Sequence, residues 1–311
     1  MTAFANRRPQ YCFLLLTLLW AKPSFGDDGC GADDEYCIEV NSFDLSVSLG
    51  LGQRSNPLVD SKSIPLLVVP QFSYYGKRFF IDNLDLGYTL YESPGLSAHL
   101  IATPGYDRVF FTRDDPQNYV ITSGFASSFN VSGSTGDPVA NPPSDPPPDP
   151  PPPPPQNGPP SEELLRRATD SLQDRERKAT YLAGFEFDIS LGQWLAQVDL
   201  LREVTGRHDG EEFRLAIARP WQVEQWGLNF SVGATWKSSE LVTYYYADSD
   251  FFELGAATNV FVKAGGIYPI SRNWDFQVLA HWEWLGDSIR QSPIIDDKRI
   301  DTLYFGWRYH F

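Results

Sequence analysis

The sequence has few cysteines, few basic residues and no long internal hydrophobic run, and each absence excludes a class of protein. Three cysteines in 311 residues are too few for the dense disulfide framework of a small secreted domain. The 25 lysines and arginines face 40 acidic residues, and this acidic balance lacks the basic surface that nucleic-acid binding needs. Beyond the N-terminus, no stretch approaches the roughly 18 consecutive apolar residues of a transmembrane helix. The 14% of aromatic residues excludes an intrinsically disordered chain.

Residues 1–26 have the layout of a secretory signal peptide. The basic pair Arg7-Arg8 precedes an apolar run over 11–20, and small residues near Gly26 mark a cleavage site. The apolar run is too short to cross a membrane as a helix. We therefore predict export through a cleavable signal.

The mature chain begins with a short periplasmic segment, residues 27–42, that holds the remaining cysteines, Cys30 and Cys37. In an exported protein such a pair favours a small disulfide loop. A metal site is the alternative, but two thiols without a nearby histidine make only half of a zinc site.

Most of the remaining sequence alternates between apolar and polar or small residues, which is the period of a β-strand. From 226 to 236, apolar residues occupy every second position and Gly, Asn, Ser and Thr fill the others. The same alternation recurs over 43–51, 84–90, 274–284 and 303–311. Such strands build either a soluble sandwich with an apolar core or an outer-membrane barrel with an apolar face toward lipid.

Three features favour the membrane barrel. The strands reach about ten residues, which is the length of a tilted membrane-spanning strand. The faces opposite the apolar ones carry many Gly, Ser and Thr residues, which suit a narrow lumen. Large aromatics lie at the ends of apolar faces, where outer-membrane barrels carry aromatic girdles. The girdle candidates are Trp226, Trp236, Trp274, Trp284 and Trp307.

We predict an all-β fold, a transmembrane antiparallel β-barrel of about 12 strands, with about 10 or 14 as alternatives. An even number is expected for a closed bacterial barrel. The predicted strands cover residues 43–52, 66–75, 79–91, 96–106, 118–131, 181–190, 194–204, 212–219, 226–236, 259–269, 274–285 and 302–311.

With both termini on the periplasmic side, most connections sort into short inner turns and longer outer loops. The predicted outer loops are residues 53–65, 205–211, 237–258 and 286–301. Two connections fit poorly, because 92–95 is very short for an outer loop and 107–117 is long for an inner turn.

Residues 132–180 interrupt the strand pattern. Between Asp137 and Pro160 lie 14 of the 25 prolines, and such a run adopts an extended polyproline helix that cannot pair in a sheet. The charge order after Ser161, acids first and bases last, predicts a short helix. The insertion thus divides the barrel into strands one to five, over 43–131, and six to twelve, over 181–311. It is either a flexible surface segment or a semi-rigid stalk that presents a partner site.

The C-terminus carries the most specific motif. The chain ends on Phe311, with an aromatic at Tyr309 and a glycine at Gly306. This pattern resembles the assembly signal that the barrel-insertion machinery reads on outer-membrane proteins. We therefore expect the barrel-assembly machinery as a partner during biogenesis.

The chain resembles the MipA/OmpV family of Gram-negative outer-membrane proteins. The resemblance rests on the order and spacing of short motifs over most of the mature chain and includes the region from Asp275 to Phe311. The motifs are Arg78-Phe79-Phe80-Ile81-Asp82, Leu86-Gly87-Tyr88, Leu191-Gly192-Gln193-Trp194, Val204-Thr205-Gly206-Arg207-His208-Asp209-Gly210, Thr243-Tyr244-Tyr245-Tyr246, Leu285-Gly286-Asp287 and Ser292-Pro293.

The resemblance implies a non-enzymatic barrel in the cell outer membrane, in contact with lipid and lipopolysaccharide. It implies a scaffold role, because the family's name-giving member is described as bridging a lytic murein transglycosylase and a penicillin-binding protein. Other members are discussed as porin-like or adhesin-like, so a narrow channel for small solutes and a surface adhesin are the alternatives. The proline insertion and the cysteine pair depart from the family pattern.

The sequence offers little catalytic chemistry. The four histidines, His99, His208, His281 and His310, lie in separate segments, and no two have the spacing of metal ligands. The sequence also lacks a Gly-x-Ser-x-Gly elbow and a phosphate-binding loop. We therefore predict no catalytic residue, no cofactor and no metal site.

Overall fold

The computed structural model describes residues 41–112, 115, 118, 172, 175–247 and 252–311. The predicted signal peptide, the cysteine pair and nearly all of the Pro-rich insertion with its helix lie outside these residues. The strands are β1 (Ser42–Arg54), β2 (Ile64–Pro65), β3 (Val68–Tyr75), β4 (Phe79–Asp82), β5 (Asp85–Ser93), β6 (Leu96–Pro104), β7 (Tyr181–Leu191), β8 (Trp194–Glu203), β9 (Glu211–Val223), β10 (Trp226–Lys237), β11 (Ala257–Ser271), β12 (Trp274–Trp284) and β13 (Arg299–His310).

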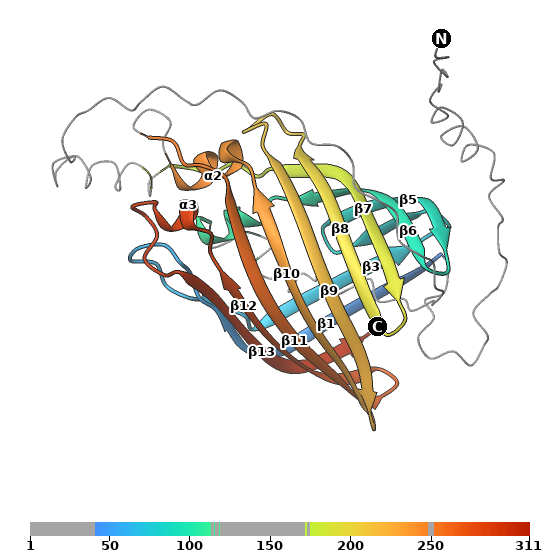
Figure 1. The fold of residues 1–311 in the computed structure, drawn as a ribbon. Coiled ribbons are helices and arrows are strands. Elements are labelled where there is room, and N and C mark those ends of the chain that lie inside the picture. Colours follow the sequence, from blue (N-terminus) through green and yellow to red (C-terminus); the bar gives the residue numbers. More distant parts are fainter. Residues whose placement is uncertain (1–40, 113–114, 116–117, 119–171, 173–174, 248–251) are drawn as a thin grey trace, which may run out of the picture. The chain divides into compact units, whose positions relative to one another are not determined.

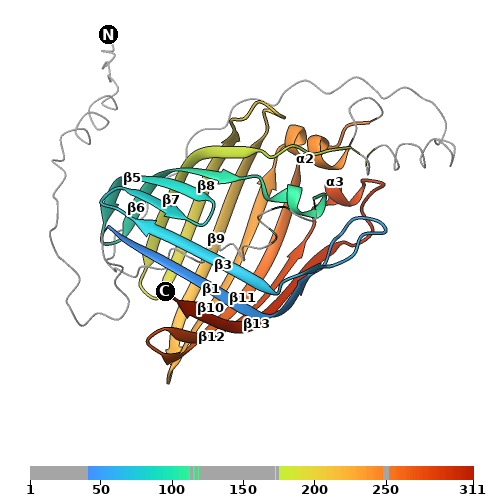
Figure 2. The same ribbon diagram turned by 180° about the vertical axis from the view of Figure 1, so that it is seen from behind.

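The strands form one antiparallel sheet that closes on itself (Figure 1, Figure 2). Neighbours in sequence pair in order from β3 to β13, and β13 returns to pair with β1 from Ser46↔His310 to Arg54↔Thr302. β2 and β3 pair with successive parts of β1, so the thirteen strands fill twelve positions around the barrel. The predicted closed barrel of twelve strands is confirmed.

The two faces of the sheet decide between a membrane barrel and a soluble sandwich. Large apolar side chains point outward and are exposed, as at Leu49, Phe230 and Phe305. Polar residues on the same strands, such as Ser48 and Ser231, are buried inside. This distribution is the reverse of that in a soluble protein and is the one that a lipid environment stabilises. The protein is an outer-membrane β-barrel.

The predicted strand 79–91 is wrong, because it consists of two strands. β4 and β5 meet at a tight turn in which Asn83 has a left-handed backbone with φ of 56°. Asparagine is one of the few residues that adopt this conformation at low cost. Because the chain reverses once more than predicted, the 94–95 turn lies at the end of the barrel that holds the C-terminus. The long 105–180 connection lies at the opposite end. The two connections that fitted poorly are thereby explained.

The predicted strand 118–131 has no position in the barrel. Nearly all of it lies outside the described residues, but β6 pairs directly with β7 from Leu96↔Ile189 to Pro104↔Tyr181. A strand between them would break this ladder. The number twelve is therefore reached with β4 and β5 as separate strands and without this one.

The loops predicted to lie on the outer side fold into a compact apolar cluster, which we call the loop cap. It contains the helices α2 (Ser239–Tyr246) and α3 (Asp287–Arg290), at the end of the barrel opposite the C-terminus (Figure 1). Its buried side chains include Leu241, Val242, Tyr245, Tyr246, Leu285 and Ile289. Each helix in the described part of the chain is too short or too polar to cross a membrane.

Candidate functional site

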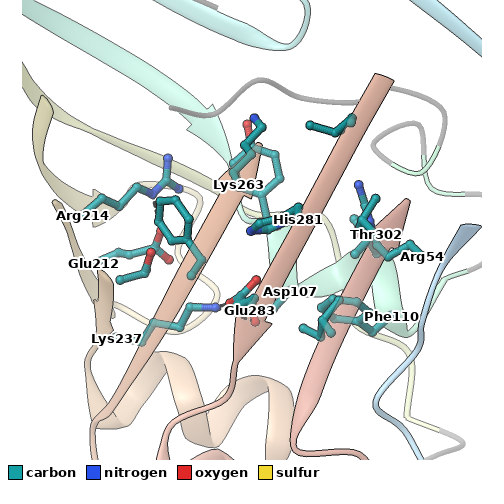
Figure 3. A pocket seen from close by; sticks show the side chains of 16 residues that line it. Arg54, Asp107, Phe110, Glu212, Arg214, Lys237, Lys263, His281, Glu283 and Thr302 are labelled. Carbon is teal, nitrogen blue, oxygen red and sulfur yellow. Dashed lines mark hydrogen bonds and ion pairs between the residues drawn. The ribbon is translucent and has the colours of Figure 1, made fainter. Parts of the chain in front are cut away.

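The lumen contains a cavity of about 160 Å³ in the half nearer the loop cap. By the same measure a water molecule needs about 10–15 Å³, so the cavity has room for several. Figure 3 shows its lining, which comes from β1, from β9 to β13 and from the segment after β6. The labelled residues are Arg54, Asp107, Phe110, Glu212, Arg214, Lys237, Lys263, His281, Glu283 and Thr302.

One side of this cavity is formed by the 3-10 helix η2 (Tyr106–Phe110), which we call the plug. It follows β6 directly and contributes Tyr106, Asp107, Val109 and Phe110 to the cavity lining. Asp107 is 3% exposed and Val109 is also buried. The start of the long outer connection thus lies inside the barrel.

A buried triad, which we call the latch, holds the plug in place. Lys237 at the end of β10 donates to both carboxylate oxygens of Asp107, with Nζ···Oδ distances of 2.6 Å. Tyr246 of α2 donates its hydroxyl to Oδ1 of Asp107 at 2.6 Å. Both side chains of the ion pair are almost fully buried. Charge-assisted hydrogen bonds between buried side chains are strong, so the latch joins plug, wall and loop cap.

The protonation state of Tyr246 supports this role. Burial, together with the charge of Asp107, raises the pKa of the Tyr246 hydroxyl well above its usual value. The hydroxyl therefore stays protonated and continues to donate over the physiological pH range.

Further contacts fix the plug at both ends. The Tyr106 hydroxyl lies 3.3 Å from a carboxylate oxygen of Asp85, and the Arg214 guanidinium lies 5.3 Å from the centroid of the Tyr106 ring. Asn56, after β1, donates its side-chain amide to the Phe110 carbonyl at 2.9 Å. The plug is therefore attached to at least three separate parts of the wall and loops.

The charges around the cavity are separated rather than fully paired. Arg214 is 2.5 Å from Glu212 and 3.8 Å from Asp199, whereas Lys263 and Arg54 have no ion pair among the residues that the structure describes. The lining holds four cationic residues, Arg54, Arg214, Lys237 and Lys263, and three acidic ones, Asp107, Glu212 and Glu283. The cations thus outnumber the carboxylates around the cavity, whereas the whole chain carries a net charge of −15.

Cross-strand register arranges several lumenal side chains in two rows, of which only the first lines the cavity. Lys263, His281, Thr302 and Arg54 are successive neighbours on β11, β12, β13 and β1, which we call the basic row. His99, Glu186 and Asp199 are successive neighbours on β6, β7 and β8, which we call the acidic row. Arg214 follows Asp199 on β9. The lumen is thus basic on one wall and acidic on another.

A comparison with known families identifies this barrel. The family described as "MltA-interacting protein MipA" matches residues 46–311. The chain belongs to the MipA family. No curated protein matches the chain.

Several solved outer-membrane proteins resemble this MipA-family barrel at low identity. The COG4313 channel of Pseudomonas putida F1 is 10% identical over 91% of this chain and 100% of its own, with a TM-score of 0.37. A loop-deletion mutant of OmpT from Vibrio cholerae is 7% identical over 88% of this chain and 100% of its own, with a TM-score of 0.34. DcaP of Acinetobacter baumannii is 7% identical over 88% and 98%, with a TM-score of 0.35. These scores are too low to assign the solutes or activities of those proteins to this chain.

The C-terminal residues singled out from sequence lie at the closing seam of the MipA-family barrel. Gly306 pairs with Gly50, Tyr309 pairs with Val47, and the Phe311 amide donates to the Leu45 carbonyl at 3.0 Å. The closing strand therefore depends on these positions for its register. Their recognition by the assembly machinery stays a prediction.

The five tryptophans lie near the two ends of the membrane-facing wall. Trp226, Trp274 and Trp307 lie toward the end that holds the C-terminus, and Trp236 and Trp284 lie toward the loop cap. Four of the five are exposed, from 37% at Trp236 to 52% at Trp307. Their role as interfacial girdles stays a prediction, and so does the Cys30–Cys37 disulfide, which lies outside the described residues.

The plug, the latch and the two charged rows were not found from sequence. The strand pattern assigns residues 107–117 to an inner turn and Lys237 to the start of an outer loop, so it does not predict that Asp107 and Lys237 meet. The sequence does contain a signal for the acidic row. Glu186 and Asp199, like the nearby Asp188, occupy lumen-facing positions of β7 and β8 that small polar residues fill in other strands. Only the register between strands brings His99 beside them.

Proposed function

We propose that this chain is a closed scaffold of the outer membrane that holds murein-remodelling enzymes at the envelope. The observation that carries the proposal is the plug, which lies in the lumen and is fixed there by the buried latch. The loop cap adds a second obstruction at the outer mouth. A barrel with these features suits a structural role better than free passage of solutes.

The family description supports the choice of partner. The family is described as MltA-interacting, so we propose a lytic murein transglycosylase as the first partner, with a penicillin-binding protein as the second. Membrane lipid and lipopolysaccharide would surround the exposed apolar wall. The barrel-assembly machinery would read the C-terminal strand. In this role the protein is not an enzyme.

Conductance tests whether the barrel is closed. The refolded full chain is placed in planar bilayers beside Lys237→Met, which breaks the latch, and beside Lys263→Met. Lys263 is the matched control, because it lines the same cavity without an ion pair among the described residues. We expect silence from the wild type and the control, and intermittent openings from Lys237→Met. Steady, solute-selective conductance of the wild type would contradict a closed scaffold.

Binding tests the scaffold role itself. The full chain in detergent is immobilised and titrated with a purified lytic murein transglycosylase, and an unrelated outer-membrane barrel serves as the control surface. Saturable binding to this chain alone supports the proposal. Equal or absent binding to both surfaces refutes the partner.

A narrow channel for small solutes is the second candidate. The cavity favours it, because the basic row lines a space with room for several water molecules. In a channel, charged rings of this kind select solutes by sign. If the wild type conducts, a shift of ion selectivity in Lys263→Met would assign the channel role to this row.

A further inference from the structure

A second polar cluster lies in the wall formed by β6 and β7, outside the cavity described above. His99 on β6 faces Glu186 on β7 directly in register, and Asp188 follows two residues later on the same lumenal face. One ligand-type atom from each side chain lies within 4.8 Å of the other two. Nε2 of His99 lies 3.4 Å from Oδ2 of Asp188. The three side chains are buried or half-buried.

Hydrogen bonds from neighbouring strands orient these side chains. Nδ1 of His99 lies 3.1 Å from the hydroxyl of Thr89 on β5, so the other ring nitrogen, Nε2, faces the two acids. Gln197 of β8 donates to Oε2 of Glu186 at 2.5 Å. Metal-binding histidines are held in this way, with the nitrogen away from the metal fixed by a hydrogen-bonding partner.

Among the described residues, the carboxylates of the cluster are not balanced by a lysine or an arginine. Within the described ranges, neither Glu186 nor Asp188 forms an ion pair with a lysine or arginine. The next residue of the acidic row, Asp199, is another carboxylate, and the nearby Arg214 is shared between Asp199 and Glu212. Half-buried carboxylates without a cation are costly, and a bound cation removes that cost.

We propose that His99, Glu186 and Asp188 bind a divalent transition-metal ion such as Zn²⁺. One imidazole and two carboxylates suit such ions better than Ca²⁺ or Mg²⁺, which prefer oxygen ligands alone. Ligands about 2.1 Å from a tetrahedral ion lie about 3.4 Å apart, so His99 and Asp188 already have that separation. Glu186 reaches the ion by a side-chain rotation, and water takes the fourth position.

The location suggests what the ion does. β6 and β7 are the two strands that flank the long 105–180 connection, so they are neighbours in space but distant in sequence. An ion held by His99 from one strand and by Glu186 and Asp188 from the other joins them. The site does not depend on whether the barrel conducts, and it is a proposal that departs from the sequence-based expectation of no metal.

Metal titration of the folded full chain tests the proposal. The protein is folded in detergent, treated with a chelator and titrated with Zn²⁺ by calorimetry, and separately with Co²⁺ by visible absorption. We expect one Zn²⁺ per chain and Co²⁺ bands of tetrahedral type. Wild-type protein that binds no Zn²⁺, or gives only the spectrum of free Co²⁺, overturns the proposal, and this arm needs no variant.

Variants assign the ligands. Glu186→Gln and His99→Gln should each weaken Zn²⁺ binding by more than about 100-fold, and Thr89→Val, which frees the His99 ring, by about 10–100-fold. His281→Gln removes a histidine of the basic row and should leave the affinity unchanged. Equal affinity in the wild type and Glu186→Gln would place the ion elsewhere and refute this site. Heat-modified migration on gels checks that each variant is folded.

Discussion

Replacing Lys237 by Met removes the cation that faces Asp107 and leaves the carboxylate buried beside Tyr246. Both partners of the ion pair are less than a tenth exposed, so bulk solvent does not reach the contact. Removing one partner of a buried pair costs about 3–5 kcal/mol. The hydrogen bond from Tyr246 remains and offsets part of this loss, which places the expected value near the lower limit, about 3 kcal/mol.

Native-state hydrogen exchange measures this loss locally. The amides of Phe111 and Thr112 donate to the Arg108 carbonyl, so they are protected only while the plug is folded. A loss of about 3 kcal/mol corresponds to about 100-fold faster exchange, because each 1.4 kcal/mol is about a factor of ten. The double variant Asp107→Asn with Lys237→Met removes both charges and should recover much of the protection.

Two results would contradict this role of the Asp107–Lys237 ion pair. Exchange in Lys237→Met that matches the Lys263→Met control would mean that the ion pair does not hold the plug. A double variant as labile as the single one would mean that the lost packing of Lys237, rather than the uncompensated charge of Asp107, opens the plug.

Three further predictions concern the seam, an outer loop and the N-terminal segment. Gly306→Val should sharply lower the amount of folded, heat-modifiable barrel on gels, because a Cβ at this glycine would lie 2.7 Å from the Leu49 carbonyl oxygen. A normal amount of folded barrel would show that the backbone at the seam can move to accept the side chain. Burial lowers the pKa of His208 from 6.5, so the folded loop favours the neutral ring and loses stability as the pH falls below that value. Hydrogen-exchange protection over 204–210, corrected for the intrinsic exchange rate at each pH, should therefore be lower at about pH 5.5 than at about pH 7, and His208→Phe should abolish this difference. Thiol labelling of the exported protein should modify Cys30 and Cys37 only after reduction; labelling without reductant would contradict the disulfide.

Most of the barrel wall was predictable because a membrane strand has a simple rule. Lipid demands an apolar residue at every second position, and β10 follows this rule over its whole length. Alternation alone does not predict a turn that contains neither glycine nor proline. The pattern therefore places Asn83 inside a strand, although its left-handed backbone reverses the chain.

The same rule does not predict which side chains meet inside the barrel. Asp107 and Lys237 are 130 residues apart, and their contact depends on η2 turning into the lumen rather than continuing β6. The cluster of His99 with Glu186 and Asp188 likewise depends on which residues of β6 and β7 face each other. A shift of one residue would turn the side chains of one strand toward lipid, so only the register creates these sites.

The two charged rows explain why the plug lies where it does. The lipid-facing wall cannot hold ions, so the barrel's charges gather in the lumen and loops, with basic residues on β10, β11 and β1 and acidic ones on β7 and β8. The plug presents the carboxylate of Asp107 to Lys237, on the basic side, whereas the next residue, Arg108, pairs with Asp115 of the outer connection. With its charges reversed, the same segment would bury a cation against Lys237, so the sign of this one residue selects the wall against which the plug packs.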